Sequence, residues 1–282
     1  LQPQATVLPG GGIRVAVAGR QDRSQSKLGL RPDPVGTKSQ PTASSPNDSA
    51  LARDSVGTSI PIESSFSVPN GTDRVLAAAA ADDVQVAGSR VTLTTGHYRL
   101  NREVQTQPGR VLVRDTLTNL TARPVGIIFS HRLAVERAQV KQAYLAGYTV
   151  SPPVTRALKT NPTAFADLGG LGLGLVALDD VLIVQSQGGC IDNGLTLGSR
   201  EFALGANASY TVEWAVYVND TGDYYDLIND VRADEGRNGT TVQGTWVTPG
   251  ALMSRRTKDS VPPPSYFDVR RPGYFCIPCL SW

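Results

Sequence analysis

Two histidines and one nearby carboxylate are the residues of this chain best suited to proton transfer. The chain holds only His97 and His131, and the stretch FSHRLAVE places Glu136 shortly after His131. An imidazole titrates near neutral pH, so two imidazoles and a carboxylate that converge on a substrate can act as general acid and base. The alternative is that each histidine is an ordinary surface or hydrogen-bonded side chain, and we weight that alternative more heavily.

Paired carboxylates are the second possible source of chemistry, because a glycosidase needs two of them at a defined separation. The acidic doublets of the chain are Asp82-Asp83, Asp179-Asp180 and Asp234-Glu235. All three lie beside expected turns or at a helix end, and adjacent residues of a strand point to opposite faces. We therefore predict solvated carboxylates and not an acid/base pair.

Other catalytic and ligand motifs are weak. The chain has no G-x-S-x-G elbow, and the GGLGLG stretch at 169–174 lacks the Lys-Ser/Thr of a phosphate-binding loop, so its glycines indicate a hairpin. Trp246, Tyr224 and Tyr225 have side chains that can stack on sugars, although core packing is the expected role of most aromatic residues.

The cysteines indicate a disulfide and not a metal site. Cys276 and Cys279 form a Pro-spaced pair near the end of the sequence, and Cys190 is the third cysteine. A structural zinc site needs about four ligands, and a redox CxxC normally opens a helix in a βαβ unit. We predict no metal and no cofactor, and a bridge from Cys190 to Cys276 or Cys279. The odd cysteine left over suggests an intermolecular bond.

The asparagines give the clearest indication of compartment. Six of the ten asparagines begin N-x-S/T sequons, namely Asn47, Asn70, Asn119, Asn207, Asn219 and Asn238. Chance would give roughly one or two such acceptor sequences. We therefore expect a secreted glycoprotein, and the start at Leu1 without Met fits a processed mature form.

Composition excludes broad electrostatic functions. The 27 basic and 25 acidic residues leave a net charge of +2, which predicts no general attraction to nucleic acid or membranes. No apolar run approaches the roughly 20 residues that a membrane-spanning helix needs.

Hydrophobic patterning predicts an all-β chain with tethered ends. Residues 1–19 form an N-terminal strand segment in which Ile13, Val15 and Val17 share one face. Residues 20–59 are a low-complexity tether, residues 60–248 a β-sandwich domain, and residues 249–282 a Pro-rich, Cys-containing tail.

Three elements of the sandwich can be predicted in detail. Residues 209–219 predict a long strand, with Trp214 on one face and Glu213 on the other. Residues 172–189 predict a hairpin that turns at Asp179-Asp180. One short amphipathic helix is expected near 223–235, capped by Thr221 or Asp223 and ended by Gly236.

Two stretches resemble a known fold family. VLVRDTLTNLTARPVGIIFSHRL is similar to the strand–turn–strand of galactose-mutarotase-like supersandwiches. YTVEWAVYVNDTGDYYDLINDVRADEG resembles the end of β-sandwich domains in large secreted bacterial carbohydrate-active proteins. The resemblance covers about residues 60–247 and implies a large antiparallel supersandwich-like fold. It also implies carbohydrate binding or processing, with His97 and His131 as the histidines of an epimerase.

Two functions follow as expectations. The first is a non-enzymatic secreted glycoprotein, a structural subunit that self-associates into an extracellular assembly or filament. The strand with Ile13, Val15 and Val17 would then pair with the sheet edge of another subunit, or alternatively fold back onto its own sheet. The second is a carbohydrate-binding or carbohydrate-processing β-sandwich domain, with glycans as its partners.

Overall fold

The structure is a computed structural model that describes residues 1–17, 58–69, 71–79, 82–158 and 161–236. The chain divides into two compact units, Leu1–Ile228 and Asn229–Trp282. The first unit contains all the strands described below. Of the second unit, the structure describes residues 229–236.

Sheet A is an eight-stranded sheet in the order β1-β2-β3-β10-β17-β16-β13, with β4 also paired to β3. Its strands are β1 (Gln4–Val7), β2 (Ile13–Val17), β3 (Thr58–Ser67), β4 (Arg74–Leu76), β10 (Ile128–Leu133), β13 (Val154–Ala157), β16 (Ser186–Ile191) and β17 (Gly194–Ser199). Every strand pair in it is antiparallel.

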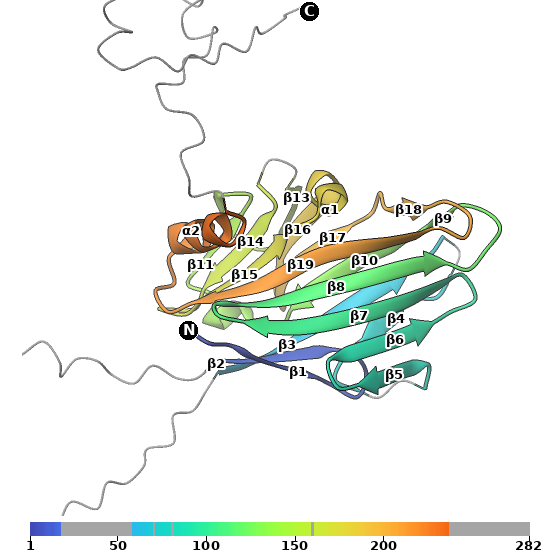
Figure 1. Ribbon diagram of the computed structural model, residues 1–282. Coiled ribbons are helices and arrows are strands. Elements are labelled where there is room, and N and C mark those ends of the chain that lie inside the picture. The colour runs from blue at the N-terminus through green and yellow to red at the C-terminus, as the bar shows by residue number, and fades with distance from the viewer. Residues whose placement is uncertain (18–57, 70, 80–81, 159–160, 237–282) are drawn as a thin grey trace, which may run out of the picture. The chain divides into compact units, whose positions relative to one another are not determined.

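Sheet B is a nine-stranded antiparallel sheet in the order β12-β11-β14-β15-β19-β8-β7-β6-β5. Its strands are β5 (Val84–Ala87), β6 (Arg90–Thr94), β7 (Tyr98–Gln107), β8 (Arg110–Asn119), β11 (Gln142–Leu145), β12 (Tyr148–Val150), β14 (Thr163–Asp167), β15 (Gly172–Ala177) and β19 (Ser209–Asn219). Figure 1 shows β19, β8, β7 and β6 side by side, without a helix over them.

The remaining elements are short. A two-stranded ribbon pairs β9 (Val125–Gly126) with β18 (Ala203–Leu204), and η2 (Arg137–Gln139) is a single 3-10 turn. The helices are α1 (Asp180–Gln185) and α2 (Tyr224–Asp234). In the described ranges, no helix has the length and apolar character of a membrane span.

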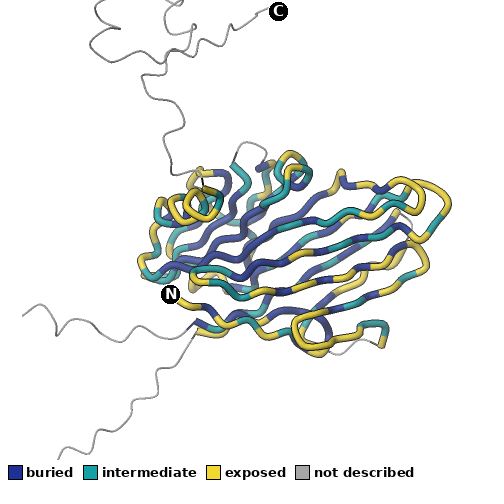
Figure 2. Tube along the Cα trace, in the orientation of Figure 1, coloured by how far each residue is buried: buried dark blue, intermediate teal, exposed yellow. Residues whose placement is uncertain are grey.

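The core lies between the two sheets, as the all-β sandwich prediction requires. Inward residues alternate with outward ones, and Ile60 and Ile62 of β3 belong to one buried cluster with Leu100 of β7 and Val113 of β8. Figure 2 shows this alternation along the outer strands as bands of buried and exposed residues. The predicted large antiparallel β fold with a short helix near 223–235 is confirmed.

The N-terminal segment belongs to the sandwich. β2 pairs with β3 of the same chain, with Val15 opposite Ile60, and Ile13, Val15 and Val17 are all buried in the common core. The structure thus shows the second of the two alternatives for this strand, because the apolar face fills its own sheet. Self-association of the chain stays a prediction.

The prediction of a hairpin that turns at Asp179-Asp180 is wrong, because a helix follows Asp179. Asp179 is the N-cap of α1, and its carboxylate accepts hydrogen bonds from the backbone N–H groups of Val181 and Leu182. The helix carries the chain from β15 in sheet B to β16 in sheet A. The apolar run at 181–184 was compatible with either structure, and the capping aspartate is what favours the helix.

The prediction for the second helix is confirmed. α2 begins after Asp223, whose carboxylate accepts a hydrogen bond from the backbone N–H of Tyr225, and Gly236 follows its end with φ +68°. In its first turns, Leu227 packs on Gly174 of β15. A Cβ at Gly174 would lie 2.9 Å from the Leu227 side chain, so this glycine permits the close packing.

The strand at 209–219 is more deeply buried than its alternation predicted. Trp214 faces the core as expected, but Ala215 and Tyr217 on the opposite face are buried as well. β19 lies between β15 and β8, in the middle of sheet B, and the Arg110 guanidinium of β8 lies over the Tyr217 ring.

Candidate functional site

The structure does not bring the three candidate proton-transfer residues together. His97 is exposed in the turn before β7, whereas His131 is buried inside the sandwich on β10. Glu136 is exposed and is the N-cap of η2. An acid/base site made of these three residues is therefore wrong for this fold.

His131 instead belongs to a buried polar cluster between the sheets. On sheet B, Arg102 and Asp115 face each other across β7 and β8 and form a bidentate ion pair of 2.7 and 2.8 Å. On sheet A, His131 Nδ1 lies 2.9 Å from the hydroxyl of Ser64 on β3. The Trp214 indole N–H donates to Asp115 at 3.0 Å.

Burial sets the charge of this cluster. Desolvation lowers the pKa of His131 to about 3, while Asp115 opposes and Arg102 supports that shift. Burial acts to raise the pKa of Asp115, but the adjacent Arg102 guanidinium overcomes it and holds the pKa below its ordinary value. The cluster therefore holds one internal ion pair and a neutral imidazole, and its burial suits it to stabilising the fold and not to binding a substrate.

Two of the three acidic doublets contain an aspartate with a structural role. Asp83 pairs with Arg74 at 2.8 Å, and Asp179 caps α1 and accepts a hydrogen bond from the Tyr210 hydroxyl at 3.0 Å. Within the described part of the chain, no group of three or more potential metal ligands occurs.

Two of the six sequons are unsuitable for glycans in the folded chain. Asn119 is 1% exposed and its side-chain nitrogen donates to the backbone oxygens of Arg123 and Gly205. Asn219 is 8% exposed and donates to the backbone oxygen of Asp223. A glycan attached to either nitrogen would replace these buried hydrogen bonds, so the structure disfavours glycosylation at these two positions, and the occupancy of the sequons stays a prediction. Asn207 is exposed, while Asn47, Asn70 and Asn238 lie outside the described residues.

The cysteine prediction is only partly accessible to the structure. Cys190 lies on β16, is buried and forms no disulfide with another described residue. Burial raises the pKa of its thiol, although Arg137 acts in the opposite direction. Cys276, Cys279 and Trp246 lie outside the described residues, and the bridge from Cys190 stays a prediction.

The tyrosines named as stacking candidates differ in exposure. Tyr224 is buried and stacks on Tyr144, with ring centroids 4.8 Å apart. Tyr225 is exposed at the surface of α2. Packing is thus the role of the first, as expected for most aromatic residues.

The outer face of sheet B carries a charged row that crosses four strands. Arg90 of β6 faces Glu103 of β7, Glu103 faces Arg114 of β8, and Arg114 faces Glu213 of β19. Arg90 pairs with Glu103 at 2.8 Å and Arg114 with Glu213 at 2.6 Å. We call these four residues the charged row. Its positive and negative charges cancel.

Polar rows continue on the same face. The next row joins Thr92, Asn101, Thr116 and Thr211 in register. Thr92 donates to Asn101 at 3.2 Å, and the hydroxyls of Thr116 and Thr211 lie 2.9 Å apart. This face therefore offers hydroxyl, amide, carboxylate and guanidinium groups in parallel lines.

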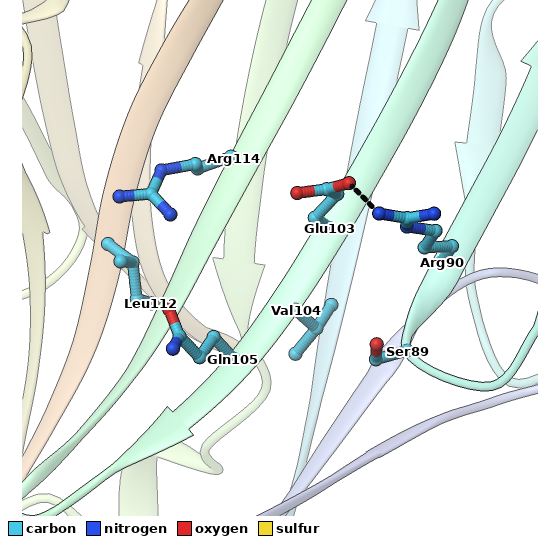
Figure 3. Close-up of a pocket in the computed structure, with 7 residues that line it drawn as sticks. All are labelled: Ser89, Arg90, Glu103, Val104, Gln105, Leu112 and Arg114. Carbon is cyan, nitrogen blue, oxygen red and sulfur yellow. Dashed lines mark ion pairs between the residues drawn. The ribbon is translucent and has the colours of Figure 1, made fainter.

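A hollow of about 280 Å³ lies beside the charged row. Figure 3 shows Arg90, Glu103 and Arg114 in one line across three strands, with Gln105 and Leu112 in the adjacent row. The hollow is lined by Ser89, Arg90, Glu103, Val104, Gln105, Leu112 and Arg114. It combines two guanidinium groups, a carboxylate and an amide with the apolar side chain of Leu112.

Sequence reasoning missed this surface. Each of its residues reads as an ordinary outward position of a strand, and only the pairing register places them in one row. Of the charged row, Glu213 lies on the outward face of the strand predicted at 209–219, whereas the sequence analysis assigned no face to Arg90, Glu103 or Arg114.

Comparisons with known proteins give limited information. No family model and no curated protein matches the chain. Among solved structures it is similar to a polysaccharide lyase, with 16% identity and a TM-score of 0.39, covering 61% of this chain and 27% of the lyase.

Two further solved structures are also similar to this chain. An α-galactosidase from Lactobacillus brevis matches with 9% identity and a TM-score of 0.41, covering 88% of this chain and 43% of that one. An aldose 1-epimerase-like protein from Escherichia coli K12 matches with 13% identity and a TM-score of 0.33, covering 55% of this chain and 78% of that one. The expected resemblance thus holds as a weak likeness to carbohydrate-active β-sandwich proteins, and no functional argument rests on it.

Proposed function

We propose that this chain is a carbohydrate-binding β-sandwich domain whose ligand surface is the outer face of sheet B around the charged row. The observation that carries the proposal is the hollow of about 280 Å³, which is lined by Arg90, Glu103, Gln105 and Arg114 together with Leu112. A saccharide presents hydroxyl groups around its ring edge and C–H groups on its ring faces. The hollow supplies planar polar groups for the first, whereas its apolar residues Leu112 and Val104 are 5% and 8% exposed and offer little surface to the second.

Charge balance supports a neutral ligand over an anionic one. Each guanidinium of the row already faces a carboxylate, so a second anion would compete with Glu103 and Glu213 for the same donors. A hydroxyl group both donates and accepts, and it can join an existing ion pair without displacing either partner.

The arrangement favours binding over turnover. The buried His131 cannot reach a ligand on the outer face, and the two carboxylates of the charged row are each paired with an arginine. Carbohydrate processing would require a catalytic group that this surface does not supply from the described residues.

The structural-subunit interpretation has weaker support. The strand that was expected to join subunits pairs with β3 of the same chain. In two of the sequons that favoured a glycoprotein, the asparagine side chain is buried and hydrogen-bonded within a turn. Secretion and the glycosylation of Asn207 stay predictions.

Binding to immobilised neutral polysaccharides tests the proposal, with galactomannan, xylan and starch as probes in native affinity gels. At least one polymer should retard the wild-type chain. Arg114→Ala should weaken that binding about 10-fold to 100-fold, because a hydrogen bond to a charged group contributes about 1.5–3 kcal/mol. Arg132→Ala is the matched control, since Arg132 is paired with Glu63 on sheet A. Release of reducing sugar would identify a processing domain instead.

A further inference from the structure

The outer face of sheet B is open where it carries the charged row. Among the described elements, Figure 1 shows no helix over β19, β8, β7 and β6, whereas Leu227 of α2 packs on Gly174 of β15. The side chains of the charged row are between 35% and 73% exposed. Their charged groups can therefore take further partners from outside the chain.

The order of the charges across the strands makes the row complementary to its own reversed copy. From β6 to β19 the row runs arginine, glutamate, arginine, glutamate, with each residue in register with the next. Reversing this order exchanges every positive position with a negative one. Unlike a free anion, a second row is neutral as a whole, and the five N–H donors of each arginine can bridge two carboxylates.

One two-fold rotation uses this complementarity. Most homodimers are two-fold symmetric, so that the same surface of both copies meets. An axis parallel to the strands, between β7 and β8 in the plane of the interface, lays the row of one copy on the reversed row of the other. Arg90 then faces Glu213 of the second copy, and Glu103 faces Arg114. An axis along the row would place like charges opposite each other, which is unfavourable.

The neighbouring rows tolerate the same rotation. In the polar row, hydroxyl and amide groups would face one another across the interface, because its members are Thr92, Asn101, Thr116 and Thr211. In the row beyond it, Arg99 of β7 would face Thr118 of β8. The row on the other side of the charged row holds Gln105, Leu112 and Ala215, which carry no charge. Like charges therefore meet in none of these rows.

The size of the face fits a weak dimer. Both β7 and β8 have 10 residues. At about 4.8 Å between strands and about 3.4 Å per residue, the four strands cover roughly 600 Å² on each copy. The total of roughly 1,200 Å² lies at the lower end of specific interfaces, and exposed ion pairs contribute little each. The expected dissociation constant is about 10–100 μM.

We infer that two copies of this chain associate through the outer face of sheet B as a two-fold dimer centred on Glu103 and Arg114. This surface differs from the N-terminal strand, and a two-fold contact closes on itself without extending into a filament. The inference does not rest on the proposed function. Where both hold, the second copy covers the hollow, so that dimerisation and saccharide binding exclude each other.

Sedimentation velocity of the full chain without saccharide tests the inference. The wild type should dimerise, and its dissociation constant should rise about tenfold between about 0.05 and 0.5 M NaCl because salt screens exposed charges. Glu103→Arg and Arg114→Glu should each be monomeric at the same concentration, because each reversal brings two pairs of like charges together. Arg132→Glu is the matched control, since it reverses one member of the ion pair with Glu63 on sheet A, and it should dimerise like the wild type.

A mixture of the two reversed variants separates a specific contact from a general loss of stability. In the mixed dimer, position 103 of one variant faces position 114 of the other with opposite charge, so all four contacts are complementary. The mixture should regain the dimer that each variant alone has lost. Arg90→Glu and Glu213→Arg form a second complementary pair, for which the same result is expected if the central reversals lower the melting temperature.

Three results would overturn the inference. They are a wild type that is monomeric up to about 1 mM, dimerisation that survives both central reversals, and mixtures of both complementary pairs that remain monomeric. Each is measured without saccharide, so failure of the dimer is distinguishable from failure of saccharide binding in the affinity gels.

Discussion

His131 stacks on Trp214 across the interior of the sandwich, with ring centroids 4.1 Å apart and an angle of 13° between the ring planes. The same indole donates its N–H to Asp115, so one aromatic side chain joins the histidine of sheet A to the ion pair of sheet B. The charge state of His131 therefore matters to the stability of the whole sandwich.

Acid should destabilise the folded chain through His131. Its pKa falls from 6.5 to about 3 on folding, so between these values the unfolded chain binds the extra proton and folding stability falls as the pH decreases. The expected loss between pH 7 and pH 5 is about 2 kcal/mol. Urea unfolding at both pH values measures it, and His131→Gln should remove most of the difference. Equal pH dependence of the wild type and the variant would show that His131 is not held neutral.

Asp115→Asn should be strongly destabilising because it leaves the Arg102 charge buried without a counter-ion. Breaking a buried ion pair in this way typically costs about 3–5 kcal/mol. Glu103→Gln breaks the exposed pair with Arg90 and should cost about 0–1 kcal/mol. Chemical denaturation of both variants measures the difference. Similar losses in the two variants would contradict the assignment of the buried pair.

Ile13→Ala should destabilise the chain itself. Ile13 is fully buried between the sheets, and truncation of a buried isoleucine typically costs about 2–5 kcal/mol. Val184→Ala is the matched surface control and should stay within about 0.5 kcal/mol of the wild type. An Ile13→Ala chain that unfolds like the wild type but loses self-association in sedimentation would restore the strand-addition model.

Glycan occupancy should follow burial. If the chain is expressed in a glycosylating host, peptide mass spectrometry should find Asn207 occupied and Asn119 and Asn219 unmodified in the folded fraction. The reason is that the two buried nitrogens already donate to backbone oxygens. Folded protein with a glycan on Asn119 would show that this turn can open.

The sequence predicted the fold where local patterns decide it. Alternation along residues 209–219 identifies β19, and Asp223 and Gly236 bracket α2. The inner polar cluster was not predicted, although the structure places Arg102 and Asp115 at inward positions of alternating strands. Their partnership with His131 depends on how two sheets pack, which no local pattern records.

The sequons show how a local pattern can have a second cause. In three Asn-x-Thr triplets, the asparagine Oδ1 accepts a hydrogen bond from the threonine hydroxyl: Asn119 from Thr121, Asn161 from Thr163 and Asn219 from Thr221. Such side-chain bonds stabilise turns. Turn formation therefore explains part of the excess of asparagine–threonine triplets that indicated glycosylation.

The charged row could not be predicted because it depends on register. A shift of one residue between β7 and β8 would separate Glu103 from Arg114 and place them on opposite faces. The hairpin register fixes them side by side, and the same register creates the hollow on which the proposed function rests.

The most direct test of that function is an NMR titration of the labelled chain with an oligosaccharide of the polymer that it binds. The largest chemical-shift changes should fall on Arg90, Glu103, Gln105, Leu112 and Arg114, and Arg114→Ala should shift the titration to about 10-fold to 100-fold higher oligosaccharide concentrations. Changes confined to other surfaces, or no change at oligosaccharide concentrations that saturate polymer binding, would contradict the assignment of the outer face of sheet B as the ligand surface.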